Sequence, residues 1–420
     1  MLLFCLIIFF CFIVFIIKDY HKAVLCFAPI SVLFQDYMCV RYVAPAISLS
    51  FLLEFIFLSI AMVKRRLSMC RFPFKKAYCL LFFVLIVGIF VSEMDFLKTG
   101  PFVFDLILSY YIVVIFYNEL KSFEDVKYSI RCFIVLILFF CAYSTIEYFV
   151  QYNPVLDYLG ETIPEEWGGR LYETTERYSS IRCQSFMTIT IGWGGLCCMA
   201  LSLMLYCRSA FVHILIPISF WFVILILIFC TYTTGTRSAF LYLMIVLFGS
   251  CIMLRGTSKR MMITLLVIGG LYTLYNMGDI ISSIISSDSS SESGSNSSMR
   301  QLQLIAAINV ISNSPIWGFG VKGVSIAGGL DGDIHGAESV WFQQLISYGL
   351  MGVISQIYIY YSIIKLLCKE SKKFIFVALG WIAFASLTTS PGLGEYYFLI
   401  IIILIYKANQ LISNRPICLK

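Results

Sequence analysis

Residues 2–17 read LLFCLIIFFCFIVFII, an apolar run without a charged residue. A hydrocarbon layer about 30 Å thick takes roughly 20 apolar residues of helix to cross, so the run indicates a membrane span or a signal peptide. A signal peptide would have a basic segment before the run and small residues at a cleavage site after it, and neither is present. We therefore interpret residues 2–17 as a first, retained span.

The remainder of the 420 residues has the same character. Hydrophobic residues make up 60% of the chain and charged residues 13%, whereas soluble domains are nearer half apolar and a quarter charged. The sequence predicts an all-α, polytopic integral membrane protein with one transmembrane domain over residues 1–420. Whether residues 23–38, which contain Pro29, span completely is left open. The apolar runs predict about 12–13 transmembrane helices, at 2–17, 23–38, 43–63, 77–92, 101–117, 130–150, 183–206, 211–231, 238–254, 260–277, 339–364, 373–389 and 394–406.

Basic residues gather in a few segments between these runs. If the spans are counted as above, all the segments lie on one side of the membrane, and the positive-inside rule makes that side cytoplasmic, together with the C-terminus. The net charge of +6 therefore reflects orientation in the membrane and does not indicate a nucleic-acid partner. The basic segments are 64–76, 121–131, 255–260, 365–373 and 407–420, with Arg208 between the second and third.

Two long polar stretches lie on the opposite side, at residues 151–182 and 278–338, and both are rich in Asp and Glu. The second contains the tract SSIISSDSSSESGSNSS at residues 282–298, which is too poor in apolar residues to pack and is expected to be flexible. The sixteen cysteines form no C-x-x-C pair. Neither a metal site nor a disulfide framework is therefore expected.

Three arginines stand at the edges of predicted spans on this acidic side. Arg182 opens the helix predicted from residue 183, Arg237 lies between two apolar runs, and Arg300 begins an amphipathic stretch. An outer arginine near the membrane edge is disfavoured by up to ~3 kcal/mol, so its presence there indicates a role. The planar guanidinium suits bidentate contact with phosphate oxygens, which predicts a phosphate-binding site. Salt bridges to the outer carboxylates, or snorkelling at the interface, are the structural alternatives.

A histidine and a glutamate precede the run at 339–364, within DIHGAES at residues 333–339. If a helix has already begun there, His335 and Glu338 are three residues apart and share a face. A carboxylate beside an imidazole can serve as a general base with a partner that tunes it. The alternative is that Glu338 is an ordinary acid at a helix N-terminus and that His335 is a solvated loop residue.

Four blocks, in this order, resemble the O-antigen polymerase and O-antigen ligase superfamily, bacterial membrane glycosyltransferases with a GT-C-like fold. RCQSF at 182–186 resembles the block that opens a middle helix, and TGTRSA at 234–239 resembles a T-x-S-R-small motif, with Thr236 in place of serine. Arg300 followed by IWGFG at 316–320 resembles an arginine helix leading to a G-x-G turn. Glu338 followed by GLMG at 349–352 resembles a block that usually opens with histidine.

The resemblance implies a metal-independent enzyme without a cofactor, in the bacterial cell inner membrane, with the two polar stretches as periplasmic loops. The donor would be an oligosaccharide on undecaprenyl diphosphate, and the acceptor a sugar hydroxyl on another lipid-linked repeat unit. Arg182, Arg237 and Arg300 would bind the diphosphate, and Glu338 or His335 would be the base. The resemblance suggests a chain-length regulator in the same membrane as a further partner.

Aromatic and cationic residues of the outer loops would form the glycan groove, although anchoring at the membrane interface is the commoner use of tryptophan. Because Glu338 stands where ligases have histidine, a polymerase is favoured over a ligase, which transfers finished polymer to lipid A–core. A flippase or other transporter of lipid-linked oligosaccharides is the alternative of another class. The groove candidates are Trp167, Arg170, Arg177, Trp317 and Trp341.

Overall fold

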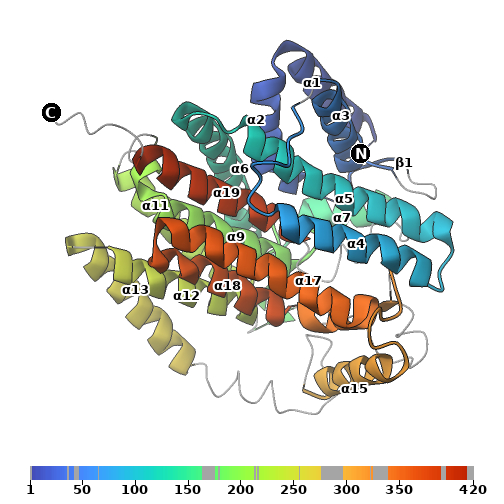
Figure 1. The fold of residues 1–420 in the computed structure, drawn as a ribbon. Helices are drawn as coiled ribbons and strands as arrows, with labels where there is room; N and C mark the ends of the chain where they lie inside the picture. Colours follow the sequence, from blue (N-terminus) through green and yellow to red (C-terminus); the bar gives the residue numbers. More distant parts are fainter. Residues whose placement is uncertain are drawn as a thin grey trace.

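The computed structural model describes residues 2–35, 37–41, 47–64, 66–162, 176–177, 180–211, 214, 217–254, 256–275, 297–321, 323–324, 339–388 and 394–413. Most of these residues are helical, and most of the long helices run side by side along one direction (Figure 1). The two strand pairs are short: β1 (Cys39–Arg41) pairs with β2 (Ile47–Ser48), and β3 (Glu176–Arg177) pairs with β4 (Ser180–Ile181), both antiparallel. The all-α prediction is confirmed.

Most of the predicted apolar runs contain an α-helix of the described residues. The α-helices are α1 (Leu2–Lys18), α2 (Tyr20–Ile30), α3 (Leu49–Val63), α4 (Lys75–Val91), α5 (Phe96–Glu119), α6 (Phe123–Val150), α7 (Pro154–Thr162), α9 (Thr190–Tyr206), α10 (Arg208–Phe211), α11 (Pro217–Thr233), α12 (Arg237–Met253), α13 (Gly256–Tyr275), α15 (Ser297–Asn313), α17 (Val340–Glu370), α18 (Ile375–Ser386) and α19 (Gly394–Ser413), with short 3-10 turns η1 (Ser31–Leu33) and η2 (Lys372–Phe374).

Length and composition fit a polytopic membrane protein. Four helices of the described residues are long and apolar enough to cross a membrane, within α5, α6, α17 and α19, and six shorter apolar helices accompany them. Large apolar side chains point outward, such as Phe90, Val135 and Phe222, which are 77%, 69% and 62% exposed. Such a surface would drive aggregation in water and suits contact with lipid.

The second apolar run does not form a full-length helix. At 1.5 Å per residue, the 11 residues of α2 extend only about 17 Å, short of a hydrocarbon layer of about 30 Å. Pro29 lies inside α2, which ends in η1, and the chain then turns back through the β1–β2 pair into α3. This arrangement resembles the re-entrant alternative for residues 23–38.

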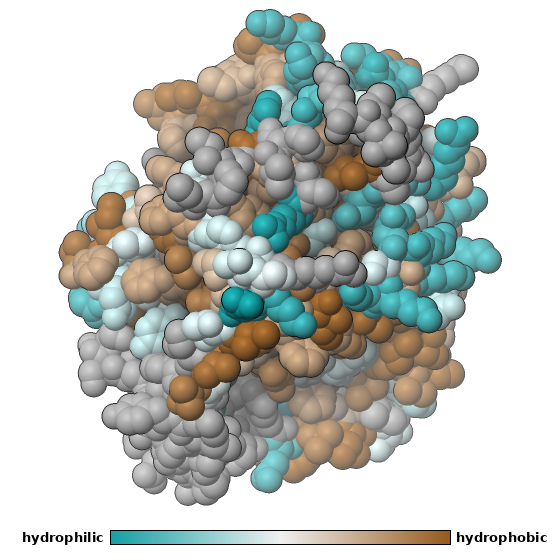
Figure 2. All heavy atoms as spheres, turned by 90° about the vertical axis from the view of Figure 1, so that its left-hand side faces the viewer, coloured by the Kyte–Doolittle hydropathy of each residue, from teal (hydrophilic) through white to brown (hydrophobic). Residues whose placement is uncertain are grey.

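Segments predicted to lie on the cytoplasmic side meet at one end of the molecule, which we call the basic end. Glu119, only 1% exposed, pairs with His21 (2.6 Å), Arg66 (3.3 Å) and Lys121 (3.6 Å). Lys373 Nζ donates to the carbonyl of Ile252 at 3.3 Å, which ties the end of α12 to the start of α18. Figure 2 views the side on which α19 ends, and hydrophilic side chains gather in the upper and right-hand parts of that face.

Candidate functional site

The segment that carries Arg182 is a loop, and this corrects one prediction. The apolar run predicted a helix from residue 183, but α9 begins at Thr190. Ser185 has a φ of 54°, which a helix does not allow, and the backbone N–H groups of Gln184 and Ser185 donate to a side chain of another helix. Arg182 therefore precedes a structured loop, residues 182–189, which we call the arginine loop.

Glu147 holds the arginine loop from the last turn of α6. One carboxylate oxygen accepts from Gln184 N at 3.2 Å and from Asn153 Nδ2 at 2.8 Å, and the other accepts from Ser185 N at 2.8 Å. The residue is 2% exposed. A carboxylate in a span is costly unless it is satisfied in this way, so these bonds account for its presence.

Further contacts fix the loop from other directions. Asn153 Nδ2 donates to the carbonyl of Ser185 at 2.9 Å, and its Oδ1 accepts from Tyr143 OH at 2.7 Å. Ser185 Oγ donates to the carbonyl of Phe140 at 3.0 Å. From the segment after α2, Tyr37 OH donates to the carbonyl of Phe186 at 2.9 Å. The arginine loop is thus bonded to α6, to the turn before α7 and to the β1 region.

Arg182 lies on the turn that leads into α12. Its Nε donates to the carbonyl of Thr234 at 2.9 Å, and its Nη2 donates to Thr236 Oγ1 at 3.1 Å. Cys183 N donates to the carbonyl of Thr233 at 3.0 Å. Arg237 is the first residue of α12 and follows this turn directly. The structure therefore places Arg182 beside the turn that presents Arg237.

The same turn ends at a helix N-terminus. Thr236 is the N-cap of α12, but its side chain makes no capping bond and instead accepts from Arg182. The positive end of the α12 dipole adds to the charge of the two arginines. Gly194 of α9 permits the close packing here, because a Cβ on it would lie 2.7 Å from Ala239 Cβ and 3.1 Å from Thr234 Oγ1. The turn before α12 thus packs directly against α9.

Arg300 lies in the first turn of α15, and its side chain is outside the described part of the structure. The helix packs against the first half of α17, where Ala307 and Ile346 are both fully buried. Of the three arginines predicted to bind the diphosphate, the structure describes the side chains of Arg182 and Arg237.

The helix α17 is broken at Gly349, which has φ 60° and ψ −152°. The segment 315–321, which contains the predicted G-x-G turn, fills the break and satisfies its backbone groups. Phe319 N donates to the carbonyl of Ile346 at 2.9 Å, and Leu350 N donates to the carbonyl of Pro315 at 3.0 Å. A helix can be interrupted inside a membrane protein when neighbouring backbone replaces its lost hydrogen bonds. The segment thereby joins α15 to α17.

Glycines are required where these backbones meet. A Cβ on Gly318, whose φ is 63°, would lie 2.6 Å from the carbonyl oxygen of Ile346, and one on Gly349 would lie 2.6 Å from that of Ile316. Gly320 contacts the end of α4 in the same way, since its Cβ would lie 2.5 Å from the carbonyl oxygen of Gly88. The two glycine motifs found in the sequence therefore form one joint, which fixes the start of α17.

In the sequence, the predicted base lies between the two motifs of this joint. His335 and Glu338 lie outside the described residues. Ser339 is the N-cap of α17 and accepts from Trp341 N at 3.3 Å, so α17 begins after both of the predicted residues. The helical i, i+3 spacing considered for the pair is therefore not provided by α17.

Two of the predicted groove residues are described, and both pack against protein. Trp341 Nε1 donates to Ser386 Oγ at 2.8 Å, and its ring meets that of Tyr360 edge-on at 5.7 Å. The ring of Trp317 lies 5.9 Å from that of Phe83. Arg177 belongs to β3, although its side chain is not described, and Trp167 and Arg170 fall outside the described residues. Across the described ranges, no three His, Cys, Asp or Glu side chains gather in a way that could hold a metal ion.

Comparison with known proteins identifies the central part of the chain. Residues 221–357 match the family model described as O-antigen ligase. The match includes the turn before α12, Arg237, Arg300 and the glycine joint, whereas Arg182 and Glu147 lie before it. A search of the curated proteins found no match. The family match confirms the resemblance to the O-antigen polymerase and ligase superfamily, whose members are glycosyltransferase-like enzymes of the membrane.

Proposed function

We propose that the protein is a repeat-unit polymerase and that residues 221–357, which match the O-antigen ligase family model, form part of its catalytic region. The enzyme transfers the growing glycan from undecaprenyl diphosphate to a sugar hydroxyl of another lipid-linked repeat unit, at the periplasmic face of the bacterial inner membrane. The observation that carries the proposal is the contact of Arg182 with the turn that begins α12 at Arg237.

The chemistry needs a site for a departing anion. The acceptor oxygen attacks the anomeric carbon, the bond from that carbon to the diphosphate oxygen breaks, and the lipid diphosphate leaves with the bonding electrons. Arg182, Arg237 and the N-terminus of α12 supply positive charge where this negative charge develops, without a metal ion. Arg300 completes the clamp if the first turn of α15 approaches the same diphosphate. This arrangement supports lipid-diphosphate-dependent glycosyl transfer.

Preorganisation supports the assignment of Arg182. Two of its N–H groups are bonded to the turn, and its loop is bonded to Glu147 and Asn153. A cation that is already oriented need not reorganise when charge develops, which is how fixed dipoles and charges lower a barrier. The arginine loop therefore holds the guanidinium of Arg182 in a fixed orientation.

The base comes from the residues just before α17. Glu338 takes the proton of the acceptor hydroxyl and His335 tunes it, with the reverse assignment as the competitor. The glycine joint holds the first half of α17 against segment 315–321. This supports a fixed position for the residues just before α17. Trp167, Arg170, Arg177, Trp317 and Trp341 would contact the glycan, and a chain-length regulator would act on the same complex.

A ligase is the second candidate, because the matching family model is described as O-antigen ligase. Glu338 in the position where ligases have histidine favours the polymerase. Deletion of the gene, followed by electrophoresis of the lipopolysaccharide, separates the two. A polymerase mutant accumulates lipid A–core that carries one repeat unit, whereas a ligase mutant loses all attached polymer. Restoration of long chains by the intact gene is the control.

A further inference from the structure

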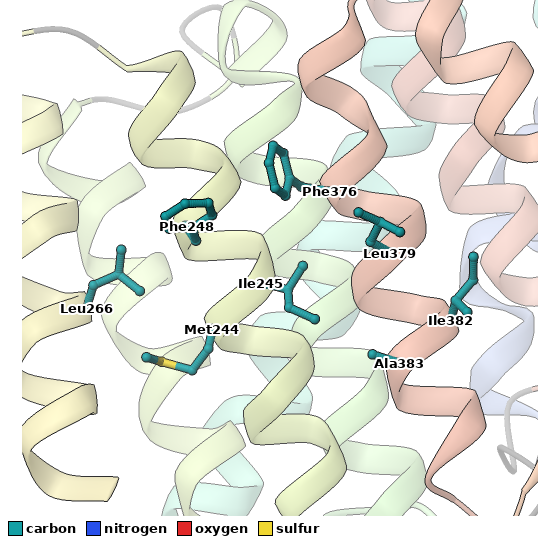
Figure 3. A pocket seen from close by; sticks show the side chains of 8 residues that line it. All are labelled: Met244, Ile245, Phe248, Leu266, Phe376, Leu379, Ile382 and Ala383. Atoms are coloured by element: carbon teal, nitrogen blue, oxygen red, sulfur yellow. The ribbon is translucent and has the colours of Figure 1, made fainter. Parts of the chain in front are cut away.

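An apolar groove opens on the outer surface of the bundle between α12, α13 and α18 (Figure 3). Phe248 and Met244 come from α12, Leu266 from α13, and Leu379 and Ala383 from α18. Every side chain that lines it is apolar, and Phe248 and Leu379 are 55% and 40% exposed. The remaining lining residues are Ile245, Phe376 and Ile382.

The floor of the groove is closed by tight helix packing. A Cβ on Gly380 of α18 would lie 2.3 Å from the ring of Tyr242 on α12, and one on Gly249 would lie 2.4 Å from Phe376 Cβ. These glycines let α12 and α18 touch, while the small side chain of Ala383 leaves room above the contact. The groove is thus a trough along a closed helix pair, and its open side lies at the surface of the bundle.

The groove continues the face of α12 that begins with Arg237. Positions 237, 241, 244 and 248 are spaced by four, three and four residues, so they form one stripe on the helix. Leu241, between the arginine and the groove, is 40% exposed. At 1.5 Å per residue, Phe248 lies about 17 Å along the axis from Arg237, close to the depth of one leaflet of a layer about 30 Å thick. A cationic head site and an apolar trough thus share one helix face.

We infer that this groove binds the isoprenoid chain of the lipid diphosphate donor. The inference rests on the proposed function, since it takes the diphosphate to lie at Arg182 and Arg237. With the head group there, the first isoprene units pass Leu241 and the chain lies against Met244 and Phe248, between α12 and α18. An ordinary phospholipid acyl chain is the competing occupant of the same trough.

The test measures binding to the purified full-length protein in detergent, by native mass spectrometry. Ala383→Trp and Met244→Trp fill the trough, and Leu225→Trp on α11, at a site 46% exposed and outside the groove, is the matched control. Each groove variant should weaken undecaprenyl diphosphate binding by roughly tenfold or more, the effect of losing about two buried methylene groups. Leu225→Trp should bind normally, and binding of phosphatidylglycerol should not change in any variant.

A second measurement keeps the wild-type chain, in case a tryptophan variant fails to fold. Undecaprenyl diphosphate with a photoreactive group in its chain should cross-link within 241–248 or 376–383. Cross-links only elsewhere, or equal loss of phosphatidylglycerol from the groove variants, would overturn the inference while leaving the proposed function intact. Absence of any saturable binding of the diphosphate lipid would overturn both.

Discussion

The two ends of the helix bundle hold their cations in different ways. At the basic end, the buried carboxylate of Glu119 is surrounded by His21, Arg66 and Lys121, so positive charge is matched by negative charge. At the other end, the described bonds that fix Arg182 come from uncharged oxygens of the turn before α12. Uncharged acceptors orient a guanidinium without cancelling its charge. The comparison sharpens the proposal: the cations of the basic end are paired with a buried carboxylate, whereas the function proposed for Arg182 requires that it bind a ligand.

The buried carboxylates differ in the same way. Glu119 bonds to cationic side chains, whereas Glu147 accepts from two backbone N–H groups of the arginine loop and from an amide. A carboxylate bonded to backbone sets the path of the chain. Glu147 therefore positions Arg182, and removal of either carboxylate should have distinct consequences.

The largest effect is expected at the proposed base. Glu338→Gln should lower polymerisation by ~10²–10⁴-fold at every pH, because an amide keeps the shape but cannot take a proton. His335→Ala should leave partial activity with a shifted pH profile. Assays of purified enzyme with lipid-linked repeat units across a pH series distinguish the two. The reverse pattern would make His335 the base, and normal rates in both variants would exclude the pair.

Arg237 should show the next largest effect. Arg237→Ala should reduce the rate by about a hundred- to thousandfold, the usual loss of ~3–4 kcal/mol when a donor aimed at developing charge is removed. Arg237→Lys should recover little, since a point charge cannot reproduce the bidentate fork. Polymer length on gels and protein abundance in membranes are the measurements. Near-normal polymer from Arg237→Ala would make this arginine structural, like those of the basic end.

Glu147→Ala tests whether Glu147 holds the arginine loop that carries Arg182. The backbone N–H groups of Gln184 and Ser185 would lose their acceptors, and the loop should move. A displacement of about 1 Å near a reacting group can cost roughly a hundredfold, so we expect a fall of ten- to a hundredfold, in kcat more than in KM. Protease sensitivity at residues 182–189 should rise.

The control for this experiment is Glu54→Ala. Glu54 of α3 is another buried carboxylate, which accepts from Ser50 on the same helix and from Ser109 on α5. Its loss should lower thermal stability without exposing the arginine loop to protease. If Glu54→Ala reduced kcat as Glu147→Ala does, with the same digestion pattern, the special role of Glu147 would be lost.

Two glycines with similar φ angles allow the stability of the two ends to be compared. Gly349→Ala adds a Cβ 2.6 Å from backbone of segment 315–321, whereas Gly256→Ala, with a φ of 63°, meets nothing within 4 Å. Both variants strain the backbone by about 1–3 kcal/mol, but only the first also displaces a packed segment. The melting temperature in detergent should fall clearly further for Gly349→Ala. Equal shifts in melting temperature would mean that the glycine joint accommodates the added Cβ without further loss of stability.

Local patterns predicted the helices well and the arginine loop badly. The run at 101–117 became α5 (Phe96–Glu119), because length and hydropathy are local properties. The helix expected from residue 183 begins seven residues later, because Ser185 has a φ of 54° and the loop bonds to Glu147 and Asn153, more than 30 residues away. No periodicity within residues 182–189 indicates that these partners exist. The carboxylate at the end of an apolar run, followed by Asn153, was the available signal.

The glycine joint was only half visible in the sequence. The motifs at 316–320 and 349–352 are separate in the sequence, and only the first predicts a turn. Their mutual contact depends on the break in α17, which requires backbone from segment 315–321 to replace hydrogen bonds that the helix loses at Gly349. Such a dependence links residues about thirty positions apart and has no signature in either motif alone.

The smallest effect is expected from Arg66→Ala at the basic end. Arg66 is partly exposed, at 38%, and its partner Glu119 keeps His21 and Lys121 when the guanidinium is removed. An ion pair of this kind contributes about 0–1 kcal/mol, so the melting temperature should change by a few degrees at most. Polymer length and rate should stay within twofold of the wild type. The variant removes a guanidinium, as Arg237→Ala does, so the two form a matched pair at opposite ends of the bundle. A loss of polymer from Arg66→Ala, at normal protein abundance, would contradict the division between architectural and ligand-presenting cations.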